Sequence, residues 1–361
     1  MMRSQLSQRR AWMDTAKGVA MLLVLVGHCM RDEMRLASPV LDYLYRGIYG
    51  FHMSWFFWLS GISYALSRAK GRPPLQIAAR RLKQQFPYWL GYGLFIYLVF
   101  TVAMVLPGVG HVLRDAGFED LSLGAYFREA FLANNPWAYH LWFLYVLILI
   151  TVIVSLCDAA LGGKRSRAVW MGLIAVSLIG LALRDTVSVG QWWRLYDYVT
   201  LYLPLFCLGA LMAEWEVPDT AARLWGIAGL AYLIVRTAFF SGFSGNSVRV
   251  DGPARFALYL LADALLPGLM VWLKLIFTRF CLPRTAFGKS FIGFLGRESL
   301  AIYLWHQPFC CAFLGLVLYG KLGLPALVTM AVCFLASLVV SWVYVQLRSR
   351  VRPLLSRKSP T

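Results

Sequence analysis

Long apolar runs separated by short polar stretches dominate the chain. Residues 18–27, 94–105, 141–156 and 328–344 are examples. A helix needs about 20 mostly apolar residues to cross a bilayer, so the pattern predicts an all-α, polytopic membrane bundle of about ten crossings. The predicted helices cover residues 13–30, 47–67, 86–106, 139–157, 168–183, 199–214, 224–240, 257–277, 299–318 and 323–347.

Two features leave alternatives to this count. The segments 168–183 and 199–214 are short, and Pro204 with Gly209 favours a bend, so nine or eleven crossings remain alternatives. No internal repeat or coiled coil is visible, and the longest predicted outer loop, 107–138, is too short for a separate domain. We therefore expect residues 1–361 to form one transmembrane domain.

The distribution of Lys and Arg predicts the orientation. Loops rich in these residues stay on the cytoplasmic side, and here one set of alternating loops holds about twice as many as the other. The richer set includes both termini. The sequence thus predicts both termini in the cytoplasm.

Composition excludes a soluble protein. Hydrophobic residues make up 60% of the chain and charged residues 14%, whereas soluble domains carry about a quarter charged residues. The net charge of +18 is scattered over membrane-flanking loops, which favours anionic lipid as its partner and not nucleic acid. The first apolar run lacks a cleavage pattern and should remain as a helix. The seven cysteines lack metal-ligand spacing, so we expect no metal site.

The first helix carries ionisable residues that lipid disfavours. Lys17 and His28 are eleven residues apart, about three turns or roughly 16 Å along one helical face, and Asp14 precedes Lys17 on the same side. Such residues usually mark function. The alternative is structural: Asp14 caps the helix, Lys17 extends to the interface and His28 is only hydrogen-bonded in the bundle.

The second helix and the loop after it hold further candidates. His52 opens the helix, and Ser60 with Gly61 lies deeper, where small residues also serve close packing. A basic cluster then follows near the predicted inner face. Its members, Arg80, Arg81 and Lys83, suit an anionic phosphate ligand, although anchoring at the membrane surface explains many such clusters.

Two later helices supply the remaining candidates. Trp142 lies near the start of the helix at 139–157, at a predicted interface where aromatic residues gather. In the helix at 299–318, Tyr303 and His306 follow one another at about one-turn spacing after Glu298. Pro308 is predicted to bend this helix, and an imidazole at such a bend favours function over packing.

These segments, in this order, resemble the membrane-bound acyltransferase-3 family. That family includes bacterial O-acetylases of O-antigens, exopolysaccharides and nodulation factors, and succinylases of periplasmic glucans. The most specific element is a basic residue, ten intervening positions and a histidine, here Lys17 to His28. Supporting elements are FHMSWFFWLSG (51–61), an Arg-x-x-Arg-like pair, LWFL (141–144) and GRESLAIYLWHQP (296–308). In the pair, Lys83 replaces the second arginine, which weakens a bidentate phosphate contact or leaves it to Arg81.

The resemblance implies a multi-pass protein of a bacterial inner membrane that transfers an acyl group, commonly acetyl from acetyl-CoA, to a sugar hydroxyl of a cell-envelope or exported glycan. The donor would be a substrate, with no tightly bound cofactor. His28 would act as general base or carry the acyl group itself, and it must be neutral for either role. Asp14 and Lys17 would orient the donor or the first helix, Tyr303 and His306 would line the same cavity, and Glu298 would hold its inner end.

Two other classes of protein remain as alternatives. Buried His and Lys residues also serve proton relays, so the chain is alternatively a transporter or flippase of a polyprenyl-linked sugar or small solute, although no inverted repeat is visible. The other alternative is a scaffold without catalysis. The combination of Lys17, His28, Arg80, Glu298 and His306 favours an enzyme.

Overall fold

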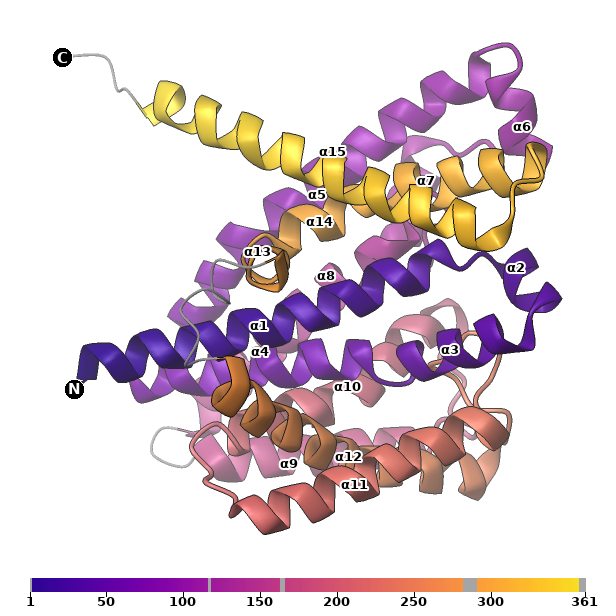
Figure 1. Ribbon diagram of the computed structural model, residues 1–361. Helices are drawn as coiled ribbons and strands as arrows, with labels where there is room; N and C mark the ends of the chain where they lie inside the picture. The colour runs from indigo at the N-terminus through magenta and orange to yellow at the C-terminus, as the bar shows by residue number, and fades with distance from the viewer. Residues whose placement is uncertain (1, 116–117, 163–165, 282–290, 357–361) are drawn as a thin grey trace. The chain divides into compact units, whose positions relative to one another are not determined.

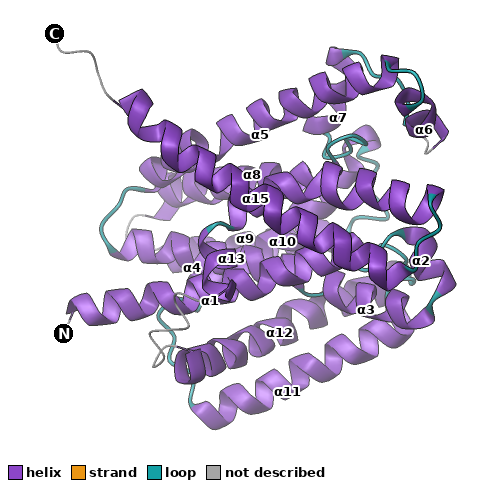
Figure 2. Cartoon of the chain, turned by 45° about the horizontal axis from the view of Figure 1, so that its top comes forward, coloured by secondary structure: helices purple, strands orange, loops and turns teal. Residues whose placement is uncertain are grey.

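The computed structural model describes residues 2–115, 118–162, 166–281 and 291–356, and these residues are almost entirely helical (Figures 1 and 2). They contain no β-strand; an isolated bridge joins Ser241 and Val248. The predicted all-α class is therefore confirmed. A bilayer favours this class, because a helix satisfies its backbone hydrogen bonds without help from solvent.

The chain forms two compact units. Unit 1 contains Met1–Met53, Asp219–Arg249 and Gly268–Thr361, and unit 2 contains Ser54–Pro218 and Val250–Pro267. Helices α4 (His52–Ala69) and α12 (Gly252–Ile276) contribute residues to both. The other elements of unit 1 are α1 (Met2–Cys29), α2 (Asp32–Ala37), α3 (Pro39–Tyr49), α11 (Asp219–Val235), η5 (Arg236–Phe240), η6 (Phe277–Cys281), α13 (Phe291–Arg297), α14 (Ser299–Trp305), η8 (His306–Phe313), η9 (Leu316–Lys321) and α15 (Ala326–Ser356). Those of unit 2 are α5 (Pro74–Val105), α6 (Val109–Asp115), α7 (Leu123–Phe131), η1 (Tyr139–Leu141), α8 (Trp142–Cys157), η2 (Asp158–Gly162), α9 (Ser166–Ala182), η4 (Gly190–Trp192) and α10 (Trp193–Leu211).

Six helical segments among the described residues are long and apolar enough to cross a membrane. They are Pro74–Val105, Tyr139–Leu161, Asp219–Phe240, Gly252–Arg279, Ser299–Lys321 and Ala326–Val351, and the apolar helix Ser166–Ala182 is shorter. The protein is thus a multi-pass membrane protein. Helix α1 is not among the six because Asp14, Lys17 and His28 lower its mean hydropathy, so the total of about ten stays a prediction.

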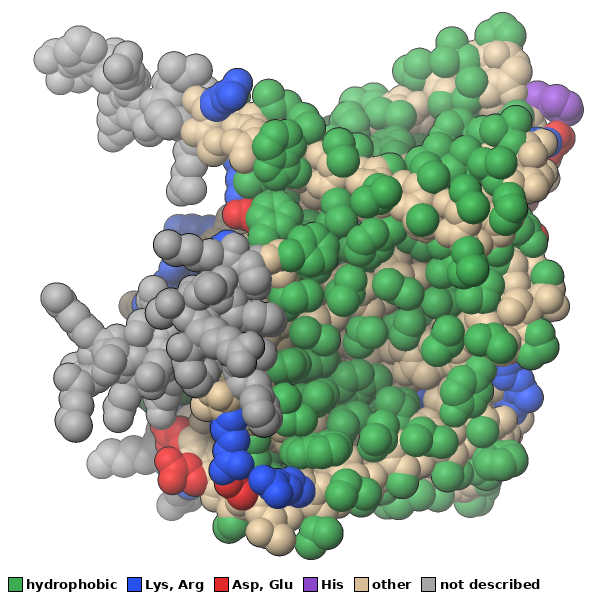
Figure 3. Space-filling model, viewed as in Figure 1, with side chains coloured by type: hydrophobic (Ala, Val, Ile, Leu, Met, Phe, Trp, Pro, Cys, Tyr) green, Lys and Arg blue, Asp and Glu red, His purple; other side chains and the backbone are tan. Residues whose placement is uncertain are grey.

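Exposed apolar side chains cover the outer faces of several helices. Leu327, Leu335 and Val339 project from α15, and Leu224 and Ile227 from α11, each more than half exposed. Figure 3 shows hydrophobic side chains spread over α15 and α11. Such a surface is unfavourable in water and suited to contact with lipid tails.

Short helices occupy segments predicted as loops. Residues 31–46 contain α2 and most of α3, and the predicted loop 107–138 contains α6 and α7. Helix α5 begins at Pro74, twelve residues before the predicted start, and contains Pro87. The hydropathy pattern missed these parts because their helical surfaces are polar or half-buried, whereas an apolar run reports only the portion in contact with lipid or core.

The helix predicted at 299–318 is broken and not merely bent. Helix α14 ends at Trp305, Gln307 has an extended backbone (φ −118°, ψ 151°), and the Gln307–Pro308 peptide bond is cis. Proline disfavours helical geometry at the preceding residue, which explains why the interruption falls on Gln307. The side chains of His306 and Gln307 therefore project from the point at which the helix is interrupted.

Close backbone approach joins α1 to α13 in unit 1. A Cβ added to Gly18 would collide with the carbonyl oxygen of Ile292, and one added to Gly296 with the carbonyl oxygen of Asp14. In unit 2, Gly61 of α4 and Gly209 of α10 similarly lie against helix backbone. Small residues let membrane helices pack closely where no hydrophobic force between them operates.

The substitution Gly296→Val is expected to destabilise unit 1 by about 1–3 kcal/mol, because the backbone of α1 cannot withdraw from the new side chain without losing packing. Thermal unfolding of detergent-purified protein measures the loss. Gly91→Val is the matched control, since an added Cβ at Gly91 in α5 meets nothing within 4 Å. Equal unfolding temperatures for the two variants would contradict this account of the α1–α13 contact.

Candidate active site

The imidazole of His28 is held at the end of α1 by side chains from α3 and η8. The hydroxyl of Tyr49 lies 3.1 Å from His28 Nδ1 and 3.4 Å from Nε2. Gln307 Nε2 lies 3.1 Å from the same Nδ1. The His306 ring packs beside it, with 4.9 Å between ring centroids. Three elements distant in sequence thus converge on one ring inside unit 1.

Two neighbouring imidazoles are held by backbone carbonyls. His52 Nδ1 lies 2.7 Å from the carbonyl oxygen of Ile48, and His306 Nδ1 lies 2.8 Å from that of Tyr303. A carbonyl oxygen only accepts a hydrogen bond, so Nδ1 carries the proton in both neutral rings. The rings of His52 and Tyr49 meet edge to face, with 4.9 Å between centroids. His52, His306 and Tyr303 therefore belong to the surroundings of His28.

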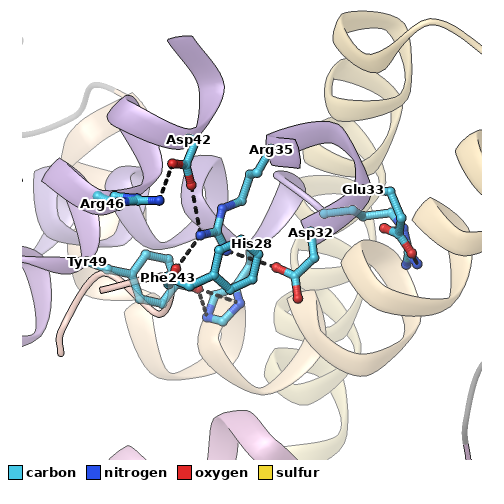
Figure 4. A network of polar contacts seen from close by, with 9 residues as sticks. His28, Asp32, Glu33, Arg35, Asp42, Arg46, Tyr49 and Phe243 are labelled. Atoms are coloured by element: carbon cyan, nitrogen blue, oxygen red, sulfur yellow. Dashed lines mark hydrogen bonds and ion pairs between the residues drawn. The ribbon is translucent and has the colours of Figure 1, made fainter. Parts of the chain in front are cut away.

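A buried arginine lies beyond Tyr49 in the same polar network (Figure 4). Tyr49 stacks on Tyr45 with 4.0 Å between ring centroids, and the Arg35 guanidinium lies 3.5 Å from the centroid of the Tyr45 ring and 3.9 Å from that of the Phe243 ring. Its side chain is 1% exposed and pairs with Asp42. Such cation–π stacking in a desolvated position is strongly attractive.

Further ion pairs extend this network across α2 and α3. Arg35 also pairs with Asp32 at 2.9 Å, Asp42 pairs with Arg46 at 2.5 Å, and Arg31 pairs with Glu33 at 2.8 Å. Burial raises the pKa of Glu33. The hydrogen bonds and the charge of Arg31 lower this pKa by more, so its net shift is downward. The short helices after α1 are thus fixed by charge pairing close to His28.

The other predicted polar residues of unit 1 lie near the middle of α1, away from His28. The backbone of Asp14 packs against Gly296 of α13, and both Asp14 and Lys17 are partly buried. Glu298 follows α13 and accepts a 2.8 Å hydrogen bond from Arg348 of α15. Asp14 and His28 are about 21 Å apart along the helix axis. The structure therefore brings His306, Tyr303 and His52 toward His28, and leaves Asp14, Lys17 and Glu298 apart from it.

A polar cavity in unit 2 contains the predicted basic cluster in part. Its volume is about 510 Å³, and Arg72, Arg80 and Arg81 line it together with polar side chains of α4 and α5, whereas Lys83 is not among its lining residues. None of the three arginines forms an ion pair with another described residue. The neighbouring Arg68 is different, because it pairs with the buried carboxylate of Asp158 at 2.8 Å.

Two predicted binding residues of unit 2 have packing partners. Ser60 precedes Gly61, where α4 lies directly against the backbone of α10. Trp142 stacks on Tyr198 with 4.0 Å between ring centroids and a 19° angle, and Tyr198 hydrogen-bonds Tyr139 at 2.9 Å. These contacts give both residues a structural role.

Sequence reasoning missed the two closest partners of His28. Tyr49 lies at the end of α3, a helix with no apolar run of its own, and Gln307 enters the sequence analysis only as part of the segment 296–308. An amide next to a break in a membrane helix is a usable signal, since backbone and side chain there need partners within the protein. The described residues contain no group of three or more His, Cys, Asp or Glu side chains that could hold a metal ion.

Comparison with known proteins places the chain in context. A family model described as an acyltransferase domain matches residues 10–346, nearly the whole chain. No curated protein and no solved structure matches this chain. The match spans both units and includes every candidate site residue described above.

The substitution Arg35→Gln is expected to destabilise unit 1 by about 3–5 kcal/mol, because it removes a buried cation from two carboxylates and two aromatic rings. Thermal unfolding in detergent measures this effect. Arg128→Gln is the control: Arg128 forms an exposed ion pair with Glu129, for which a change below about 1 kcal/mol is expected. A similar small change for both variants would show that the Arg35 network contributes little.

Proposed function

We propose, from the premise that this chain belongs to the acyltransferase-3 family, that it transfers an acyl group from acyl-CoA to a hydroxyl of a cell-envelope or exported glycan. Its family membership and apolar helices make it a membrane acyltransferase. The observation that carries the finer proposal is the imidazole of His28, held by Tyr49 and Gln307 at the end of α1. Acetyl is the acyl group that the family resemblance favours.

The proposed reaction uses His28 as general base. The acceptor hydroxyl gives its proton to the imidazole while its oxygen forms a bond to the thioester carbonyl carbon. The carbon–sulfur bond then breaks, CoA leaves as a thiolate with the electron pair, and the imidazolium returns the proton to sulfur. An acyl-histidine intermediate is the alternative, and it would appear as labelled protein when acyl-CoA is supplied without acceptor.

The arginines of unit 2 supply a site for the donor's phosphates in this proposal. Arg72, Arg80 and Arg81 line one polar cavity without ion-paired partners among the described residues, and guanidinium groups match phosphate oxygens in geometry and charge. The membrane arrangement we propose for this reaction has about ten crossings, with both termini in the cytoplasm of a bacterial cell.

The substitution His28→Ala is expected to reduce acyl transfer by at least about a hundredfold, because it removes the proposed base. Transfer from labelled acyl-CoA to glycan, by purified protein in vesicles, measures the loss. His111→Ala is the control, since the His111 side chain in α6 is 80% exposed. Retained transfer in His28→Ala would exclude His28 as the base. Proton-coupled solute uptake by wild-type vesicles without acyl transfer would instead favour a transporter.

The substitution Arg80→Gln is expected to raise the KM for acyl-CoA about tenfold, corresponding to about 1.4 kcal/mol of lost binding. Lys83→Gln is the matched control on the same helix, because Lys83 does not line the cavity. Acyl-pantetheine lacks the nucleotide phosphates, so with this donor the wild type and Arg80→Gln should have the same KM. Equal effects of the two variants on acyl-CoA would show that the cavity does not bind the donor phosphates.

A further inference from the structure

We infer that Gln307 is a positioning residue whose amide pairs with His28 Nδ1 in either protonation state of the ring, by donating to the bare nitrogen or by accepting from the protonated one. The inference rests on the proposed role of His28 as a base, but it concerns a residue outside the motif that suggested that role. Its basis is the 3.1 Å contact between the Gln307 carboxamide and His28 Nδ1, with the Tyr49 hydroxyl at the same distance.

The two ends of the carboxamide have opposite effects on the imidazole. With the amide nitrogen toward the ring, Nδ1 must accept, and the proton of the neutral ring lies on Nε2. With the amide oxygen toward the ring, Nδ1–H donates, and Nε2 holds the lone pair that takes a proton from a hydroxyl. A half-turn of the terminal amide interconverts the two states, and the Tyr49 hydroxyl rotates to suit either.

The neighbouring histidines lack this freedom at Nδ1. His52 and His306 each direct Nδ1 at a backbone carbonyl, which accepts only and therefore keeps the proton on that nitrogen. At His28 Nδ1 both partners are side chains able to donate or accept. A base that takes a proton from the acceptor and returns one to the thiolate needs partners that remain favourable in both protonation states.

Two contacts between the end of α1 and η8 hold Gln307 close to His28. Arg31, which follows α1, donates a 3.1 Å hydrogen bond to the carbonyl oxygen of Ala312 in η8. Cys29, next to His28, lies 3.7 Å from Cys311 between their sulfur atoms, and both side chains are buried. The extended backbone at Gln307 directs its side chain from η8 toward α1. The distance between amide and ring is therefore set by packed elements.

Other titratable groups around His28 bear on any pH test. Tyr49 from α3 and His306 from η8 face the ring, and His52 from α4 lies behind Tyr49. Arg35 from α2 belongs to the same network but is paired with Asp32 and Asp42. The charged Glu298 and Arg348, at α14 and α15, pair with each other. Helix α13 packs against α1 near Asp14, far from the ring.

The substitution Gln307→Glu tests the inference by replacing the amide with a group that only accepts. The carboxylate holds the proton on Nδ1 and favours the imidazolium, so the rise of kcat with pH should move upward by about one pH unit. At higher pH, kcat should return to within about twofold of the wild-type value, because Nε2 is then the base. Gln346→Glu, an exposed position on α15, is the control and should leave the profile unchanged.

The substitution Gln307→Met keeps length and volume but removes both hydrogen-bonding ends. It should lower kcat about tenfold, leave the KM for acyl-CoA within about twofold, and leave the pH profile in place. If Gln307→Glu does not accumulate in membranes, Gln307→Met still tests the inference. Full kcat in Gln307→Met, or an unshifted profile in an active Gln307→Glu, would overturn the inference.

A second readout does not depend on acyl transfer. Diethyl pyrocarbonate reacts with the unprotonated nitrogen of an imidazole, and peptide mass spectrometry measures its rate at His28 as pH is varied. The same upward shift of about one pH unit is expected in Gln307→Glu. A shift here in a protein without transfer activity would support the role of Gln307 and reject the proposed function; an unshifted rate would reject the role of Gln307.

Discussion

A polar side chain packed among the helices of a membrane protein must find its hydrogen-bond partners within the protein, because lipid offers none. His28 shows the consequence for this chain. Its ring is met by a hydroxyl from α3 and an amide from η8, and those partners require the elements that carry them to stay close to the end of α1. Much of the architecture of unit 1 serves that requirement.

Two kinds of contact hold α1 in place. Near Asp14, glycine residues let α1 and α13 touch backbone to backbone, a contact of shape without directional polar bonds. Near His28 the contacts are polar: Arg31 reaches the backbone of η8, and Arg35 ties α2 to α3 and to the loop at Phe243. A helix held near its middle and at its C-terminal end in this way presents the imidazole of His28 in a defined orientation.

The three imidazoles of unit 1 differ in what their partners permit. Backbone carbonyls keep the proton on Nδ1 of His52 and His306, so these rings have a fixed tautomer. The side-chain partners at Nδ1 of His28 impose no such choice. This difference comes from the chemistry of the partner groups, and it separates a ring suited to accept and return protons from rings suited to line its surroundings.

The sequence by itself determined the helical class, the membrane setting and the family, because apolar runs and the Lys17–His28 spacing are local properties of one segment each. It also made His28, His306 and the basic cluster at Arg80 candidates for the site, which stay predictions. Only the tertiary structure decided that Tyr49 and Gln307 meet at one ring, that Glu298 pairs with Arg348 away from it, and that Arg81, and not Lys83, lines the cavity with Arg80. Which side chains meet depends on where helices end, cross and break, and these are set by packing between segments far apart in the chain, which no single segment encodes.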